Sequence, residues 1–173
     1  MKALAFWKAV SVDRDNLLER IVDFLAEHQI CYCVIDGQAV NAYAEPVVSL
    51  DLDLVVAIDQ VDYVERALAS EFSVKRFSHS LNVSSPGSDL RIQFQTDPRY
   101  SSFPNRASRR EIVGLVLPVA RIEDVLRGKV WAVQDPTRRA SKRQKDLADI
   151  ARLLETDPIL REEVPDDVLA RLV

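Results

Sequence analysis

The sequence is poor in the residues that build disulfides and histidine metal sites. It has two cysteines and two histidines among 173 residues. Cys31 and Cys33 are separated by one residue in a predicted strand, so they point to opposite faces, which is a poor geometry for a bridge. We expect buried thiols instead. His28 and His79 are far apart in the chain, which argues against a histidine-based metal site.

Long apolar runs and a strong net charge are also missing. No apolar run approaches the roughly 20 residues that span a bilayer. The N-terminal segment 1–15 lacks the apolar core and cleavage site of an export signal. We therefore expect a cytoplasmic protein that makes no membrane contact. The net charge of −4 gives no overall signal for nucleic-acid binding.

The spacing of apolar residues predicts alternating helices and strands. Helical spacing marks residues 13–29, 61–72, 121–134 and 145–155. Strand patterns mark 30–35, 48–58, 89–95 and an edge strand at 112–120, with weaker strands at 72–77 and 81–83 and a loop with a helical turn at 96–110. This order indicates an α/β (α+β) fold, with a mixed β-sheet and flanking helices. We expect a sheet domain over 1–120 and a C-terminal helical segment over 121–173, packed together as one compact unit.

Two aspartates stand one residue apart in the strand predicted at 48–58. Successive side chains of a strand point to opposite faces, so Asp51 and Asp53 project from the same face. Their like charges repel each other, and a dication such as Mg²⁺ or Mn²⁺ relieves that repulsion. We therefore predict that both are metal ligands. The alternative is a solvated edge strand whose acids face water.

A glycine marks the end of the strand predicted at 30–35. Gly37 lies where this strand gives way to a short helix that ends at Glu45-Pro46. Backbone N–H groups at such a helix start can receive an anion, which in a nucleotide enzyme would be the triphosphate. A turn glycine with no ligand is the alternative.

Two further segments can contribute polar groups to the same site. The strand at 89–95 alternates cleanly, and we expect it beside the aspartate strand, with Asp89 or Gln93 facing the site. A run of cations between Arg138 and Lys145 lies near the start of the last long helix, where the helix dipole disfavours cations. This run is explained either by a solvated basic loop or by an anionic ligand or RNA backbone.

The order of strand, glycine turn, short helix and D-x-D strand resembles the nucleotidyltransferase superfamily. Gly37-Gln38 is followed by 12 residues and then by Asp51-Leu52-Asp53, close to that superfamily's signature of Gly-Gly or Gly-Ser and Asp-x-Asp/Glu. The segments GQAVNAYAEP, DLRIQFQTDPRY, EDVLRGKVWA and KRQKDLADIARLLE are similar to the AbiEii-type (abortive-infection) nucleotidyl transferase toxin-like proteins. The resemblance covers residues 15 to 155.

The resemblance implies a Mg²⁺-dependent (or Mn²⁺-dependent) enzyme that transfers a nucleoside monophosphate from a nucleoside triphosphate to a hydroxyl of tRNA or of a protein. It also implies the toxin of a toxin–antitoxin pair, with an antitoxin protein as partner. Asp51 and Asp53 would be the catalytic metal ligands.

The resemblance also implies residues that bind the triphosphate. Gly37 and the Gln38 backbone would hold the phosphates, with the Gln38 amide near the γ-phosphate. Lys129 would supply a point charge for the triphosphate. Arg138 and Lys142, from the cationic run, are further candidates for substrate binding.

Two positions depart from the family's pattern. Gln38 stands where the family has glycine or serine, and it adds bulk where the phosphates approach. Gln93 faces the substrate where such enzymes place a third carboxylate, and an amide can neither accept a proton nor balance a second metal's charge. Asp89 reaches the aspartate pair only if the strands are offset. The alternatives are a catalytically impaired nucleotidyltransferase-fold protein with a binding or regulatory role, and a structural domain with no nucleotide role.

Overall fold

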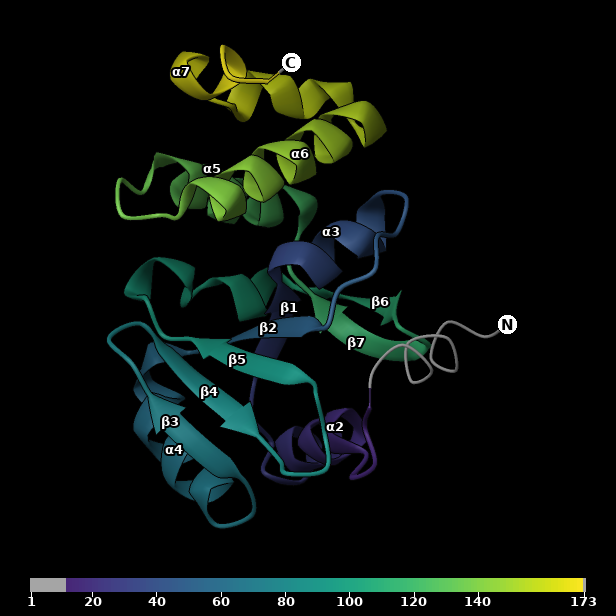
Figure 1. The fold of residues 1–173 in the computed structure, drawn as a ribbon, viewed down its shortest axis with the longest axis vertical. Coiled ribbons are helices and arrows are strands. Elements are labelled where there is room, and N and C mark those ends of the chain that lie inside the picture. Colours follow the sequence, from purple (N-terminus) through teal and green to yellow (C-terminus); the bar gives the residue numbers. More distant parts are fainter. Residues whose placement is uncertain (1–11, 173) are drawn as a thin grey trace.

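Seven strands form one mixed sheet with helices on both faces (Figure 1). The computed structural model describes residues 12–172; residues 1–11, on which the expected lack of an export signal largely rests, lie outside this range. The strand order is β3-β4-β5-β2-β1-β7-β6. The strands are β1 (Tyr32–Ile35), β2 (Asp51–Val56), β3 (Ser73–Arg76), β4 (Ser80–Ser84), β5 (Arg91–Gln95), β6 (Ser108–Ile112) and β7 (Leu115–Val119). The predicted α/β class with a mixed sheet is confirmed.

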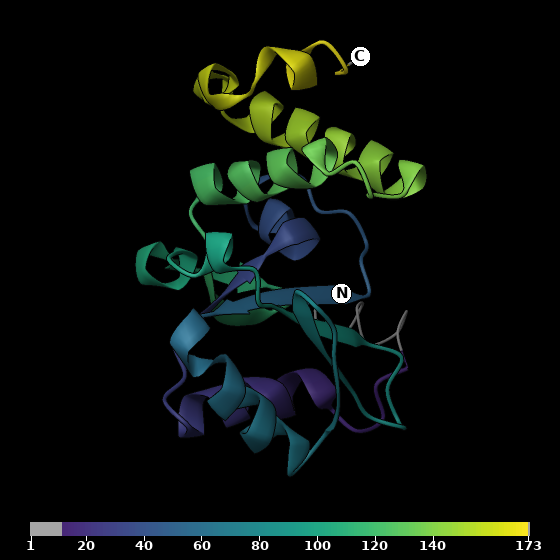
Figure 2. The same ribbon diagram turned by 90° about the vertical axis from the view of Figure 1, so that its left-hand side faces the viewer.

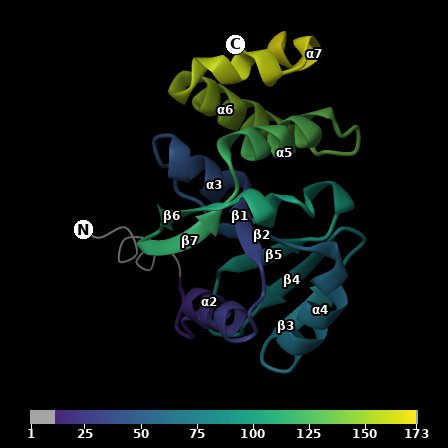
Figure 3. The same ribbon diagram turned by 180° about the vertical axis from the view of Figure 1, so that it is seen from behind.

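The helices form a layer on each side of the sheet (Figure 2). One layer holds α2 (Leu17–Glu27) and α4 (Val61–Ala69), and the other holds α3 (Asp36–Tyr43), α5 (Ile122–Gln134), α6 (Ala140–Thr156) and α7 (Asp166–Leu169). Short 3-10 helices in the connections are η1 (Ile58–Gln60), η2 (Pro98–Tyr100), η3 (Phe103–Arg106) and η4 (Pro158–Glu163). The view from behind shows α5, α6 and α7 stacked on one side of the sheet and α2 and α4 on the other (Figure 3). None of the described helices is long and apolar enough to cross a membrane.

The strand register brings the polar residues of two strands together. β2 pairs in parallel with β5, so that Asp53 lies beside Gln93 and Asp51 beside Arg91. β1 pairs antiparallel with β2 and ends at Ile35, the partner of Asp53. The predicted pairing of the aspartate strand with the strand at 89–95 is confirmed. Because β1 ends beside Asp53, the chain enters α3 next to the aspartates.

Two predictions about the other half of the sheet are wrong. The segment expected as an edge strand holds β7, which lies between β1 and β6 and is internal. The edge strand on this side of the sheet is β6, which begins in the segment 96–110 that was expected to be a loop. Its residues are exposed except Ile112, so its charged side chains face water and no apolar alternation marked it as a strand. The helix expected to start at 145 begins at Ala140.

The helical segment continues the same core. The core is one cluster of buried apolar side chains, to which the last turns of the chain contribute Leu160, Val164 and Val168. The hydroxyl of Tyr43 in α3 donates to the carbonyl of Ala120 at 2.7 Å. The division into 1–120 and 121–173, packed as one compact unit, stays a prediction. The expectation of buried thiols is half right, since Cys33 is buried and Cys31 is exposed.

Candidate functional site

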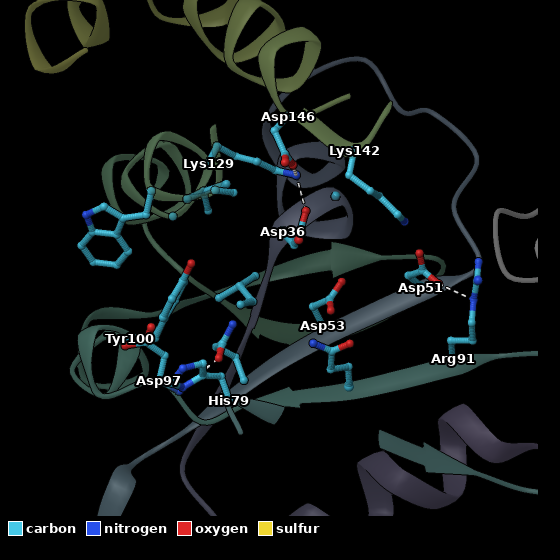
Figure 4. A pocket seen from close by; sticks show the side chains of 18 of the residues that line it. Asp36, Asp51, Asp53, His79, Arg91, Asp97, Tyr100, Lys129, Lys142 and Asp146 are labelled. Carbon is cyan, nitrogen blue, oxygen red and sulfur yellow. Dashed lines mark hydrogen bonds and ion pairs between the residues drawn. The ribbon is translucent and has the colours of Figure 1, made fainter. Parts of the chain in front are cut away.

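A cavity of about 660 Å³ lies between the sheet and the helical segment. Strands β2 and β5 line one side of it, and α5 and α6 line the other (Figure 4). The cavity brings together residues that are far apart in the chain, namely Asp36, Gly37, Asp51, Asp53, Gln93, Lys129, Arg138, Lys142, Lys145 and Asp146. Asp89 does not line this cavity; it is exposed and precedes β5.

The two aspartates of β2 both face the cavity, as strand alternation predicts. Figure 4 shows Asp53 pointing toward Asp36 and Asp51 pointing toward Arg91. Asp51 forms an ion pair with Arg91, whose Nε lies 2.6 Å from its carboxylate and whose side chain is 70% exposed. An ion pair this exposed contributes little free energy. Asp51 is therefore available to a stronger cation.

The carboxyl of Asp53 is strongly perturbed by its surroundings in the cavity. Burial is the largest cause, followed by the negative charges of Asp36 and Asp51, and together they raise the pKa of Asp53 to about 8. Lys129 and Lys145 oppose this shift only in part. A carboxyl crowded by two others is a site where a dication lowers the free energy of the ionised form.

Asp36 carries the unusual backbone of the strand-to-helix turn. Its φ of 57° is in the left-handed region, whereas Gly37 is not among the residues with positive φ. A non-glycine residue in this conformation is held by its surroundings. Burial tends to raise the pKa of Asp36, but the cations Lys129, Arg138 and Lys145 outweigh it and hold that pKa below its ordinary value.

The ammonium of Lys129 is enclosed by three carboxylates. It contacts Asp36 and lies 3.0 Å from Asp146 and 2.8 Å from Asp149. The Lys129 side chain is 3% exposed. Burial by itself lowers the pKa of Lys129, but the three carboxylates reverse the effect and raise it. The lysine that the sequence analysis assigns to a triphosphate thus has its charge matched by protein acids.

The Gln38 side chain points away from the cavity. It is 3% exposed, and its amide donates to the carbonyl of Ser49 at 3.0 Å. Its oxygen accepts from Asn41 at 3.3 Å. The side chain thus ties α3 to the segment that leads into β2, and the assignment of Gln38 to the phosphates stays a prediction. Glutamine here leaves the cavity open.

The cations of the loop and of α6 differ in their partners. Arg138 donates to Asp146, with nitrogen–oxygen distances of 2.9 and 2.8 Å, so it helps to fix that buried acid. Lys142 is exposed and points into the cavity between Asp36 and Asp51 (Figure 4). Lys145 is exposed and lines the cavity one turn further along α6.

The far end of the cavity is aromatic. The ring of Tyr100 meets the ring of Trp131 edge-on at a centroid distance of 5.1 Å. The guanidinium of Arg99 lies over Trp131, 4.9 Å from the ring centroid. Gly128 lies in the middle of α5, where a Cβ atom would come within 3.1 Å of the Tyr100 ring. This end offers planar apolar faces, whereas the end near Asp53 offers charges.

Two groups of carboxylates could hold a metal ion. One oxygen from each of Asp36, Asp146 and Asp149 lies within 4.8 Å of the others, but the Lys129 ammonium already contacts all three. Asp51 and Asp53 face the cavity, and the cation that contacts Asp51, Arg91, is 70% exposed. Carboxylate oxygens are the ligands that Mg²⁺ and Mn²⁺ prefer. The β2 pair therefore fits the implied ion better than the triad does.

The sequence analysis missed Asp36, Asp146 and Asp149. The signal for the last two was present, because both interrupt the apolar face of α6 that holds Leu147 and Ile150. An acid on a buried helix face requires a partner. The signal for Asp36 was weaker, since an aspartate before a glycine is common in turns without ligands.

The comparisons with known proteins bear on the fold. No protein-family model matches the sequence, and no curated protein matches it. The structure of ANT(2'')-Ia in complex with adenylyl-2''-tobramycin is similar over 91% of this chain and 97% of that chain, with a TM-score of 0.60 and 15% identity. The lincomycin-bound lincosamide antibiotic adenylyltransferase LnuA is similar over 80% of this chain and 97% of that chain, with a TM-score of 0.55 and 11% identity. An antigenic nucleotidyltransferase-like protein from Paracoccidioides brasiliensis is similar over 94% of this chain and 89% of that chain, with a TM-score of 0.52 and 19% identity. The chain therefore has a nucleotidyltransferase fold.

Proposed function

We propose that this protein is a Mg²⁺-dependent nucleotidyltransferase that transfers a nucleoside monophosphate from a nucleoside triphosphate to a hydroxyl. The observation that carries the proposal is the pair Asp51 and Asp53, which faces a cavity beside the Gly37 turn. The fold is shared with the antibiotic-resistance factor ANT(2'')-Ia and the lincosamide antibiotic adenylyltransferase LnuA. We propose tRNA or a protein as the acceptor, and an AbiEii-like toxin with an antitoxin partner as the setting, on the sequence resemblance stated above.

The proposed reaction is an in-line displacement at the α-phosphorus. The acceptor oxygen forms a bond to that phosphorus, the bond to the β-phosphate oxygen breaks, and pyrophosphate leaves with the electron pair. Asp51 and Asp53 would hold a dication, which neutralises charge that develops on the phosphates. Gly37 lies in the first turn of α3, where backbone N–H groups have no partner within the helix, and its N–H would receive a phosphate oxygen. The remaining contribution is positioning in a partly enclosed cavity.

Gln93 favours a second candidate, a nucleotide-binding protein that turns over slowly. It lies beside Asp53 on the neighbouring strand, where a carboxylate would take the proton of the acceptor hydroxyl. An amide cannot accept that proton, so water must take it. Asp36 faces Asp53 from the opposite side, but its lowered pKa makes it a weak base.

Label transfer tests the proposal. The protein is incubated with each labelled nucleoside triphosphate, Mg²⁺ or Mn²⁺, and one of three acceptor sets: total tRNA, a lysate of proteins, or aminoglycoside and lincosamide antibiotics. We expect transfer to a macromolecule that Asp51→Ala abolishes and Gln93→Glu accelerates. Nucleotide binding with no transfer to any acceptor would favour the second candidate, and no binding at all would reject both.

A further inference from the structure

Two lysines line the same cavity in opposite settings. Lys129 is buried, and three carboxylates match its charge. Lys145 is exposed, and within residues 12–172 no carboxylate lies at ion-pair distance from it. An ammonium that three acids already hold gains little from a phosphate. An ammonium in water with no ion pair can exchange its hydration for a phosphate contact.

Lys145 stands next to the Gly37 turn. The side-chain position that Gly37 leaves empty lies 3.8 Å from the Nζ of Lys145 and 4.0 Å from the Oγ of Ser49. The same ammonium lies close enough to Asp36 and Asp53 to lower the pKa of each. Lys145 therefore joins the turn to the aspartate pair, which is where a triphosphate bound to the dication would lie.

Lys142 extends this arrangement along α6. Residues three apart share one face of a helix, and Lys142 also lines the cavity and points into it (Figure 4). The two lysines come from the helical segment, whereas Gly37 and the aspartates come from the sheet. The cavity thus has the aspartate pair on the sheet side and, on α6, two exposed lysines beside the buried Asp146.

We propose that Lys145, with Lys142 beside it, binds the phosphate groups of the nucleotide, and that Lys129 is an internal cation that makes no phosphate contact. This assignment rests on the proposed function, because it assumes that the dication at Asp51 and Asp53 carries a triphosphate. The phosphate-binding ammonium is thus assigned to α6 instead of α5.

The test is a binding titration with inorganic tripolyphosphate, followed by one with a fluorescent nucleoside triphosphate and Mn²⁺. We expect Lys145→Gln to weaken tripolyphosphate binding roughly 10- to 100-fold, the range for a lost charge-assisted hydrogen bond, with an unchanged melting temperature. Lys145→Arg retains most of the affinity, and Lys142→Gln has a smaller effect. Lys75→Gln is the matched control, because Lys75 is exposed and lines the same cavity but lies on β3; its loss leaves the affinity unchanged.

The outcomes separate this proposal from the transferase proposal. No tripolyphosphate binding by the unchanged protein, or equal affinities for Lys145→Gln and Lys75→Gln, overturns the phosphate assignment. The assignment is also overturned if Lys129→Met remains folded but loses tripolyphosphate binding while Lys145→Gln retains that binding. Binding that depends on Lys145 in a protein that transfers no label upholds the phosphate site and rejects the transferase. If Lys145→Gln transfers label with an unchanged KM for the triphosphate, the phosphate-binding role of Lys145 is rejected and the transferase proposal stands.

Discussion

The two faces of the sheet are packed by different chemistry. Helices α2 and α4 bury only apolar side chains among their described residues. On the other face, α3, α5 and α6 bury five polar or charged side chains, Gln38, Asp124, Lys129, Asp146 and Asp149. Buried ion pairs contribute little net stability, because desolvation offsets their attraction. Both faces bury apolar side chains in one core, and the buried charges of the cavity face additionally fix side chains at the cavity.

The largest effect should come from removing the one cation that several buried acids share. Lys129→Met leaves Asp146 and Asp149 buried without their ammonium, and we expect a loss of about 3–5 kcal/mol in the free energy of unfolding at pH 7. Urea unfolding measures this loss.

A truncation on the apolar face should produce a comparable loss with no pH dependence. Leu68 in α4 is fully buried, and Leu68→Ala creates a cavity that costs about 2–5 kcal/mol. We expect the same loss at pH 5 and at pH 7. We also expect tripolyphosphate binding to be unchanged at a temperature where the variant is folded. A changed tripolyphosphate affinity in Leu68→Ala would show that packing on the α2 and α4 face affects the cavity on the other face.

The raised pKa of Asp53 predicts a pH effect on the metal-free protein. The folded pKa is about 8 and the ordinary value is 3.8, so the folded state favours the protonated acid. This contribution to stability is complete below pH 3.8 and is lost as the pH rises through the window up to about 8. Asp53→Asn should remove that decline, as followed by thermal unfolding between pH 5 and 8.

The same shift predicts that a dication displaces a proton. At pH 7 the Asp53 carboxyl is protonated before the ion binds, and the ion favours the carboxylate. Calorimetric titration of Mn²⁺ in two buffers with different ionisation enthalpies should show proton release, which Asp53→Asn abolishes. Equal heats in both buffers would contradict an ion at this carboxyl.

The smallest effect on stability should come from the exposed pair of Arg91 and Asp51. Because Arg91 is 70% exposed, Arg91→Ala should change the free energy of unfolding by less than about 1 kcal/mol. It should also tighten Mn²⁺ binding, since Asp51 no longer shares its carboxylate with a guanidinium. Weaker Mn²⁺ binding in this variant would instead assign Arg91 to the ligand.

Sequence periodicity predicted the elements of the fold better than the partners of its charges. The alternation around Asp51 and Asp53 gave their common face, and the alternation at 89–95 gave the strand that pairs with them, because both patterns are local. The edge strand β6 was missed because an exposed edge has no apolar face to alternate with. Its neighbour β7 was misplaced because apolar content alone does not separate an internal strand from an edge strand.

The roles of the lysines depend on contacts between distant segments. Lys129 meets Asp36, 93 residues away in the chain, and only the packing of α3 against α5 and α6 reveals this contact. Lys145 lies in the cationic run for which an anionic ligand was one of two explanations, but its place beside Gly37 follows from tertiary structure. Spacing along one helix cannot distinguish an ammonium inside a cluster of acids from one that faces a cavity.

The position of Trp131 at the aromatic end of the cavity gives the protein an optical reporter. The chain has two tryptophans, and Trp131 lines the cavity with Arg99 over its ring. A ligand that displaces this guanidinium changes the surroundings of the indole and hence its emission. A Trp7→Phe variant would assign the whole tryptophan signal to Trp131, so that ligand entry could be followed in real time without a label.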